Sequence, residues 1–348
     1  MNDLVMYARE QKTSDIHLNV GSPAMFRIHG KLVPCDLALT DEHITYLIQS
    51  MFDAEKQRKF EAGEDLDFAL AAPDGSRSRV NVLRSKGKMG AVLRLLNTSI
   101  PTPEQLNLPP VLLDIADKPR GLILVTGPTG SGKSTTLAAM INHVNMTKPV
   151  HILTIEDPIE YVYPQGVAAV RQREIGVDVK DFDTALKSAL REDPDVILVG
   201  EMRDYETISL AVTAAETGHL VMGTLHTTSA AMTIDRIIDA CPPAAQAQVR
   251  TQVAATLQGV ITQCLVPLKN GGGRVAATEI LVGTDAAMNL VRTSKAHQLN
   301  SIMQMGKKEG MHTLNSDLAR LYKEGKIGYD DALEYCTDKG ELTKMMGE

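Results

Sequence analysis

Residues 127 to 134 read GPTGSGKS, so Gly127, Gly132, Lys133 and Ser134 occupy the phosphate-loop spacing G-x-x-x-x-G-K-[ST]. The backbone N–H groups of such a loop and the positive end of the following helix hold phosphate oxygens. The lysine reaches the outer phosphates, and the serine hydroxyl is a ligand for Mg²⁺. The segment therefore predicts a site for a nucleoside triphosphate with Mg²⁺. The predicted nucleotide-binding residues are Gly127, Pro128, Thr129, Gly130, Ser131, Gly132, Lys133, Ser134 and Thr135.

An acidic segment, ILTIEDPIEY, covers most of the strand predicted at 151–155 and continues beyond it. Carboxylates at the carboxyl edge of a parallel sheet lie on the side that binds ligands. ATP hydrolysis needs a carboxylate that orients or deprotonates the attacking water, and we assign this role to Glu160. Glu156 and Asp157 are expected to support metal and water. The alternative is a solvated acidic turn at Pro158.

A second carboxylate, Glu201, follows the apolar run 196–199 and Gly200. An apolar strand that ends in a carboxylate is the usual Mg²⁺-side partner of a phosphate loop, although here the acid is a glutamate. We therefore expect Ser134 and Glu201 on the metal side. The alternative is an acid at the start of a helix, paired with Arg203.

Two histidines flank the strand predicted at 220–224, in the sequence GHLVMGTLHT. A histidine just past a strand end can contact a γ-phosphate and report its presence, and we assign this sensing role to His226. His219, at the other end of the strand, is expected to hold the turn.

The elements that position these residues alternate between strand and helix from about residue 115 onward. Strands are predicted at 122–126, 151–155, 196–199 and 220–224, and amphipathic helices follow the glycine loop and lie between the later strands. This pattern predicts a parallel sheet with helices on both faces. The tail beyond 284 is expected to be helical.

The first part of the chain reads as a smaller α+β domain. Strands are predicted at 16–20, 66–70, 79–84 and 91–96, with a hairpin over 25–33 that turns at His29-Gly30 and a helix face at Ile44, Leu47, Ile48 and Met51. The proline-rich stretch after it indicates a linker. The expected divisions are an N-terminal domain at 1–97, a linker at 98–112 and an ATPase domain with a helical C-terminal tail at 113–348.

Composition narrows the function classes. The net charge of -7 and an aromatic content of 4% argue against a protein built to coat nucleic acid or to stack single strands. The four cysteines, Cys35, Cys241, Cys264 and Cys336, form no C-x-x-C pair, so a structural zinc site is not expected. No apolar run approaches the roughly 20 residues that a membrane-spanning helix needs.

Long segments of the chain resemble the secretion ATPase superfamily that drives type IV pili and type II secretion, and within it the pilus retraction motors. The resemblance covers nearly the whole chain and implies a catalytic Glu160, a Mg²⁺-linked Glu201 and a sensing His226. The matching segments are TSDIHL (13–18), GPTGSGKS (127–134), TIEDPIEY (154–161), SALREDPDVILVGEMRD (188–204) and TAAETGHLVMGTLHTTSAAMTIDR (213–236).

The same resemblance assigns roles to two arginines of the N-terminal domain. In this family two such arginines reach the nucleotide phosphates when subunits close, and the segment SRVNVLRSKGKMGAVLRLL places them at Arg79 and Arg94. From the residues alone, both are solvated strand arginines. A guanidinium fork on the γ-phosphate would stabilise charge in the transition state.

The resemblance also implies an architecture and partners. It implies a RecA-like P-loop ATPase core with a smaller N-terminal α+β domain of the PAS-like kind, assembled as a homohexamer. Such rings hydrolyse ATP and act on an inner-membrane pilus platform protein, which draws pilin out of the fibre and drives twitching motility. We expect a cytoplasmic protein, peripheral to the inner membrane through its partners, which can include other pilus ATPases. No nucleic acid partner and no direct membrane insertion are expected.

One segment departs from the retraction motors, which carry a helix reading close to AIRNLIRE. The matching stretch here begins at Ala286, and Met288 replaces an arginine while Thr293 replaces a glutamate. The departure motivates an alternative function, an accessory ATP-binding subunit that modulates another pilus or secretion motor. A DNA-translocating ring ATPase shares the phosphate loop but is disfavoured by the negative charge.

Overall fold

The computed structural model describes residues 1–28, 31–72, 74–96 and 99–347. The chain divides into two compact units: Met1–Ser99 with Pro158–Val162, and Ile100–Asp157 with Tyr163–Glu348. The predicted turn at His29-Gly30 and the predicted domain boundary at 97 and 98 lie outside the described residues.

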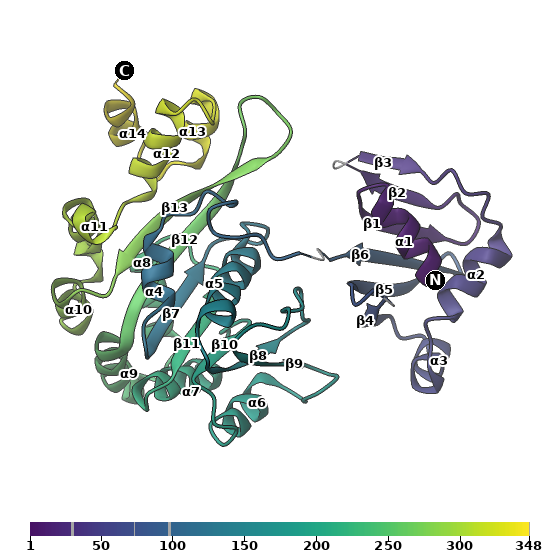
Figure 1. The fold of residues 1–348 in the computed structure, drawn as a ribbon, viewed down its shortest axis with the longest axis horizontal. Coiled ribbons are helices and arrows are strands. Elements are labelled where there is room, and N and C mark those ends of the chain that lie inside the picture. Colours follow the sequence, from purple (N-terminus) through teal and green to yellow (C-terminus); the bar gives the residue numbers. More distant parts are fainter. Residues whose placement is uncertain (29–30, 73, 97–98, 348) are drawn as a thin grey trace. The chain divides into compact units, whose positions relative to one another are not determined.

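The first unit is built on an antiparallel six-stranded sheet in the order β3-β2-β1-β6-β5-β4 (Figure 1). The predicted strands are confirmed within a few residues, and the expected hairpin is formed by β2 and β3. The helix predicted around Ile44 is confirmed as α2, whereas α1 and α3 were not predicted. The strands are β1 (Thr13–Asn19), β2 (Met25–Ile28), β3 (Lys31–Pro34), β4 (Leu66–Ala71), β5 (Arg77–Ser85) and β6 (Lys88–Leu95), and the helices are α1 (Asn2–Glu10), α2 (Asp41–Gln49) and α3 (Ala54–Glu61).

One face of this sheet is apolar because alternate strand residues point to the same side. Ile16, Leu93 and Val80 face one another across β1, β6 and β5, and all three are fully buried. Helix α2 begins at a capping box, in which the Thr40 hydroxyl accepts from the His43 N–H. The opposite face of the sheet is left for polar side chains.

The second unit contains a seven-stranded sheet in the order β13-β12-β7-β11-β10-β8-β9. The four predicted strands are confirmed as β7, β8, β10 and β11, whose pairings are parallel. The predicted parallel sheet is confirmed, and one further strand, β13, is added at its edge, where it pairs antiparallel with β12. The strands are β7 (Gly121–Thr126), β8 (His151–Glu156), β9 (Ala169–Glu174), β10 (Val196–Val199), β11 (Leu220–Leu225), β12 (Leu257–Pro267) and β13 (Arg274–Val282).

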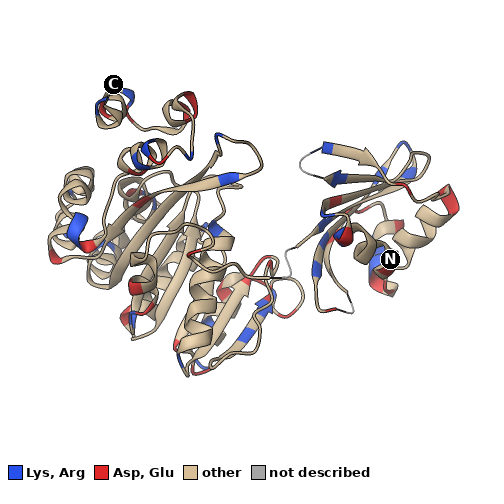
Figure 2. Ribbon diagram, turned by 45° about the horizontal axis from the view of Figure 1, so that its top comes forward, with Lys and Arg blue, Asp and Glu red and all other residues tan. Residues whose placement is uncertain are grey.

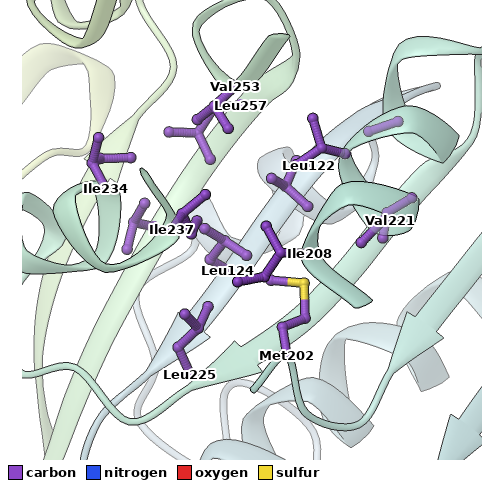
Figure 3. Close-up of a cluster of buried hydrophobic side chains, with 14 of the residues drawn as sticks. Leu122, Leu124, Met202, Ile208, Val221, Leu225, Ile234, Ile237, Val253 and Leu257 are labelled. Carbon is purple, nitrogen blue, oxygen red and sulfur yellow. The ribbon is translucent and has the colours of Figure 1, made fainter. Parts of the chain in front are cut away.

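Helices cover both faces of this sheet, and its central strands carry almost no charged residue (Figure 2). On one face α4 and α5 pack against Ile123, Val125 and their neighbours. On the other, Met202 and Ile208 meet Leu124 and Leu225 in the largest cluster of buried side chains (Figure 3). The helices are α4 (Val111–Ala116), α5 (Lys133–Thr147), α6 (Phe182–Ala189), α7 (Tyr205–Glu216), α8 (Ala230–Asp239), α9 (Pro243–Thr256), α10 (Asp285–Arg292) and α11 (Leu299–Met305).

The tail beyond 284 is helical, as predicted. Its last three helices are α12 (Leu314–Lys323), α13 (Tyr329–Tyr335) and α14 (Lys339–Met346), and they pack on Val266, Val275 and Ala277 of β12 and β13. The four cysteines are free thiols, of which only Cys241 is fully buried. No helix in the described part of the chain combines the length and apolar character that crossing a bilayer requires.

Candidate nucleotide site

The carboxyl ends of the parallel strands bring the predicted chemical residues to one edge of the sheet. β7 ends at Thr126 and passes into the phosphate loop, and it pairs with β11, which ends at Leu225 just before His226. β10 is the next strand, and Glu201 follows it after one glycine. Because these strands are parallel and in register, their ends lie at the same edge.

The phosphate loop takes a backbone path that suits glycine. Gly127, Gly130 and Gly132 have φ values of 140°, 78° and 89°, in the region that residues with a Cβ rarely adopt. At Gly127 a side chain is also excluded by space, because an ideal Cβ would stand 2.2 Å from the main-chain oxygen of Gln263. Gly132 is the N-cap of α5, so the loop delivers the helix N-terminus to the site.

Lys133 and Ser131 provide the polar groups inside the loop. The Lys133 ammonium is almost completely buried and donates to the carbonyl oxygens of Gly127 at 2.8 Å and Pro128 at 3.1 Å. Within the described ranges the buried Ser131 Oγ has no hydrogen-bond partner. A buried hydroxyl without a partner, beside a lysine and a helix N-terminus, fits a loop that receives phosphate oxygens.

Ser134 and Thr135 lie in the first turn of α5, with Ser134 exposed. The Ser134 hydroxyl and the Glu201 carboxylate are hard oxygen donors of the kind that Mg²⁺ prefers. Among the residues the structure describes, no group of three or more His, Cys, Asp or Glu side chains is placed to hold a metal ion. Mg²⁺ bound through one protein carboxylate, a hydroxyl and nucleotide phosphates does not require such a group.

Glu201 and His226 are brought together. His226 Nε2 lies 3.0 Å from Glu201 Oε1, and Arg203 Nη2 lies 2.6 Å from Glu201 Oε2. The hydrogen bond from Arg203 is the main cause that lowers the pKa of Glu201; burial opposes it, and His226 adds to the lowering. The pairing with Arg203, which the sequence offered as an alternative, is therefore present together with the contact to His226. His219 contacts the Ala214 carbonyl at 2.9 Å and holds the turn before β11.

The acidic segment after β8 is divided between the two units. Glu156 is nearly buried, and its Oε1 accepts from Thr154 Oγ1 at 2.6 Å and from Gln172 Nε2 at 3.2 Å. Asp157 is exposed and ends the first segment of the second unit. Glu160 is also exposed and lies in Pro158–Val162, which groups with the first unit. The role of Glu160 toward water therefore stays a prediction.

Arg79 and Arg94 face each other on β5 and β6 of the first unit. The row continues across the sheet, because Asp15 on β1 faces Arg94 and Arg27 on β2 faces Asp15. Arg94 Nε donates to Asp15 Oδ1 at 3.0 Å, and the Arg94 side chain is 70% exposed. Burial alone would raise the pKa of Asp15, but hydrogen bonds from Ser14 and Arg94 outweigh it and hold the pKa below its ordinary value.

Like charges at facing positions of a sheet repel each other. An anion bound between Arg79 and Arg94 would thus reduce the repulsion between the two guanidinium groups. Asp15 neutralises only part of their positive charge. The roles of both arginines toward a nucleotide stay predictions.

Two residues of these sites were missed from the sequence. Asp15 lies within the segment TSDIHL, but nothing in its local pattern indicates a link to Arg94, 79 residues away. Gln263 reaches the phosphate loop from β12, and its contact with Ser131 spans 132 residues. Neither has a local signal, because both contacts depend on how distant strands pair.

The segment that departs from the retraction motors forms α10. Met288 is 7% exposed and belongs to the large core cluster, so the methionine suits its position by packing. Thr293 is the exposed C-cap of the helix, and its hydroxyl donates to the Asn289 carbonyl at 2.8 Å. Of the two changed positions, Met288 therefore lies in the core and Thr293 lies at the surface.

Comparisons with known proteins agree with one another over most of the chain. Residues 1–308 match the family described as type II/IV secretion system protein. The chain is 48% identical over 335 residues to the type IV pilus retraction ATPase PilT of Pseudomonas aeruginosa, which covers 96% of this chain and 97% of that protein. It is 38% identical over 338 residues to the type IV pilus ATPase PilU of the same organism, covering 97% of this chain and 88% of that one.

A solved structure is also similar. The crystal structure of the pilus retraction motor PilT with bound ADP superposes with a TM-score of 0.92 at 46% identity, covering 99% of both chains. The two-part architecture found here is thus shared with a structure that contains a nucleotide.

Proposed function

This chain belongs to the type II/IV secretion system protein family, and from that membership we propose that it is the ATP-hydrolysing motor of type IV pilus retraction. The observation that carries the proposal is the 48% identity to a pilus retraction ATPase over 96% of the chain. The phosphate loop on β7 and α5 supplies the chemistry that such a motor needs. The enzyme is an ATP hydrolase, and its substrate is ATP.

Each residue of the proposed mechanism has a separate task. The loop N–H groups and the α5 N-terminus hold the phosphates, and Lys133 reaches the outer ones. Ser134 and Glu201 would hold Mg²⁺, which neutralises charge on the phosphates when bound. Glu160 orients the attacking water.

The remaining proposed residues read and stabilise the γ-phosphate. His226 contacts Glu201 at 3.0 Å. Loss of the γ-phosphate can therefore change the contact between these two side chains, and the resulting movement of His226 can shift the loop before α8. Arg79 and Arg94 stabilise the charge that develops on the transferred phosphoryl group.

The proposed assembly is a homohexameric ring in the cytoplasm, held near the inner membrane by its partners. The partners are the pilus platform protein of the inner membrane and other pilus ATPases. This part of the proposal rests on the relatives, which are pilus proteins by name.

The test is the retraction of fluorescently labelled pili in living cells that carry this chain as the sole retraction ATPase. Wild-type protein is expected to restore retraction, whereas Lys133→Ala and Glu160→Gln are expected to leave pili extended. Purified Glu160→Gln protein should bind ATP but hydrolyse it at least 100-fold more slowly, a typical order for the loss of a general base. Normal hydrolysis by Glu160→Gln would remove that residue from the mechanism.

A second candidate is an accessory ATPase that modulates a dedicated retraction motor. It is favoured by the 38% identity to a second pilus ATPase over 97% of the chain. The same cells separate the two functions. An accessory subunit would leave pili extended when present alone and would restore retraction only together with another motor.

A further inference from the structure

Strand β12 continues past the point where its neighbour β7 ends. The last pair between the two strands is Thr262 with Thr126, and their hydroxyls are 2.8 Å apart in the interior. β7 gives way to the phosphate loop at Gly127, whereas β12 runs on to Pro267. Gln263 is therefore the first residue of β12 beyond its pairing with β7; on that side it meets the loop, while on the other side it pairs with Thr278 of β13.

The side chain of Gln263 joins the end of the loop to the first turn of α5. It is 2% exposed; its Nε2 donates to the Ser131 carbonyl at 2.6 Å, and its Oε1 accepts from Thr136 Oγ1 at 2.8 Å. The same Nε2 lies 3.1 Å from the place that a Cβ on Gly132 would occupy. Because both ends of the amide are used, the amide can take only one orientation.

The bond to Ser131 has a consequence for the next N–H group. In a trans peptide the C=O of one residue and the N–H of the next point in opposite directions. Holding the Ser131 carbonyl toward β12 therefore turns the Gly132 N–H away from β12. That N–H is one of the donors with which a phosphate loop holds its ligand.

We propose that Gln263 is a positioning residue of the nucleotide site, which fixes the Ser131–Gly132 peptide so that the Gly132 N–H is directed at the nucleotide phosphates. The inference rests on the proposed nucleotide function of the loop. A donor that is already oriented binds more tightly than one that must be ordered on binding. Loss of the Gln263 hydrogen bond should thus weaken the binding of ADP, which has a second phosphate, more than the binding of AMP, which has only one.

The experiment compares Gln263→Met, which removes both hydrogen bonds at similar length, with Gln263→Glu, which removes the donor to Ser131. Thr136→Val is the matched control, because it removes only the bond on the other end of the amide. ADP binding is measured by calorimetry, and AMP binding by competition against a fluorescent ADP analogue. The melting temperature of each protein without nucleotide is recorded as well.

Both Gln263 variants are expected to bind ADP about tenfold more weakly, the loss expected for one well-placed hydrogen bond. AMP affinity should change less than twofold, and Thr136→Val should bind ADP within about threefold of wild type. ADP affinity equal to wild type, or an equal loss for ADP and AMP, would overturn the inference. If Gln263→Met does not fold, Gln263→Leu, which adds no charge beside the phosphates, decides by the same comparison of ADP affinity with AMP affinity.

Lys133→Ala separates this inference from the premise on which it rests. Lys133→Ala that binds ADP as well as wild type would overturn the proposed nucleotide function of the loop. If Lys133→Ala loses ADP binding while the Gln263 variants keep it, only the proposed role of Gln263 is overturned.

Discussion

At the scale of single residues, Glu201 lies between the side chains of Arg203 and His226, and the charge of Glu201 therefore contributes to the stability of the fold. The pKa of Glu201 is lowered from its ordinary value of 4.5. The ionised Glu201 carboxylate therefore makes its whole contribution to the free energy of unfolding above about pH 4.5. This contribution is lost as the pH falls through the lowered pKa of Glu201. We expect Glu201→Gln to lower the stability at neutral pH by less than about 1 kcal/mol, since Arg203 is largely exposed.

Urea unfolding of wild type and Glu201→Gln at pH 7 and at the lowest pH where both stay folded measures this dependence. The difference in the free energy of unfolding between wild type and Glu201→Gln should become smaller at the lower pH. Glu309→Gln, at an exposed glutamate, is the control and should match wild type throughout. A gap that widens as the pH falls would contradict the direction assigned here.

Asp15 is the one carboxylate in the arginine row of the first unit, and its side chain is only 8% exposed. Asp15→Asn should lower the free energy of unfolding by about 1 to 2 kcal/mol, because a charge-assisted hydrogen bond is lost beside two arginines. Chemical denaturation measures the loss. Asp15→Asn combined with Arg94→Ala should lose less than the sum of the two single variants, because one interaction links them. Additive losses would show that the pair is not coupled.

At the scale of elements, the meeting of the phosphate loop with β12 leaves no room for a side chain at Gly127. Gly127→Ala would place a methyl group against the Gln263 carbonyl, so either the loop or the strand must move. We expect ATP hydrolysis to fall below detection and the melting temperature to drop by several degrees.

Gly176→Ala is the control for this substitution, because it has a positive φ of 80° but open space around the new methyl group. It should lose at most about 1 to 2 kcal/mol of stability and keep its ATPase rate. Equal loss of activity in both variants would show that backbone strain, and not the contact with β12, is responsible.

The elements that the sequence predicted correctly are those with a strong local pattern. β7, β10 and β11 are fully buried and read as short apolar runs between turns. β12 and β13 were missed because they form an antiparallel hairpin, which interrupts the strand–helix alternation. β9, with the sequence AVRQRE, lies at the sheet edge and has three charged residues among its six, so its apolar signal is weak.

The residues of the candidate site likewise differ in whether a local sequence pattern predicts them. The loop, Glu201 and His226 could be placed at one edge because all three follow predicted parallel strands. Gln263 could not, since its place depends on the register of β12 against β7 and on β12 being the longer strand. Long-range register is set by packing and not by a local motif.

At the scale of the whole molecule, the proposed ring predicts that activity depends on assembly. We expect specific ATPase activity to rise with protein concentration as subunits associate, and light scattering with MgATP to report the mass of six chains. Arg94→Ala should assemble as wild type does but hydrolyse ATP at least tenfold more slowly. A constant specific activity together with the mass of a single chain would exclude the hexamer.

The four free thiols of the chain have a consequence for chemical labelling. Burial raises the pKa of Cys35 and Cys241, and it raises that of Cys264 to about 12, so little reactive thiolate forms at these three positions at neutral pH. A maleimide dye should therefore spare them in the native protein, and intact mass spectrometry followed by peptide mapping can verify this. A reporter fluorophore can then be attached at one engineered surface cysteine without first removing Cys35, Cys241 and Cys264, and with Cys336 as the single position to replace.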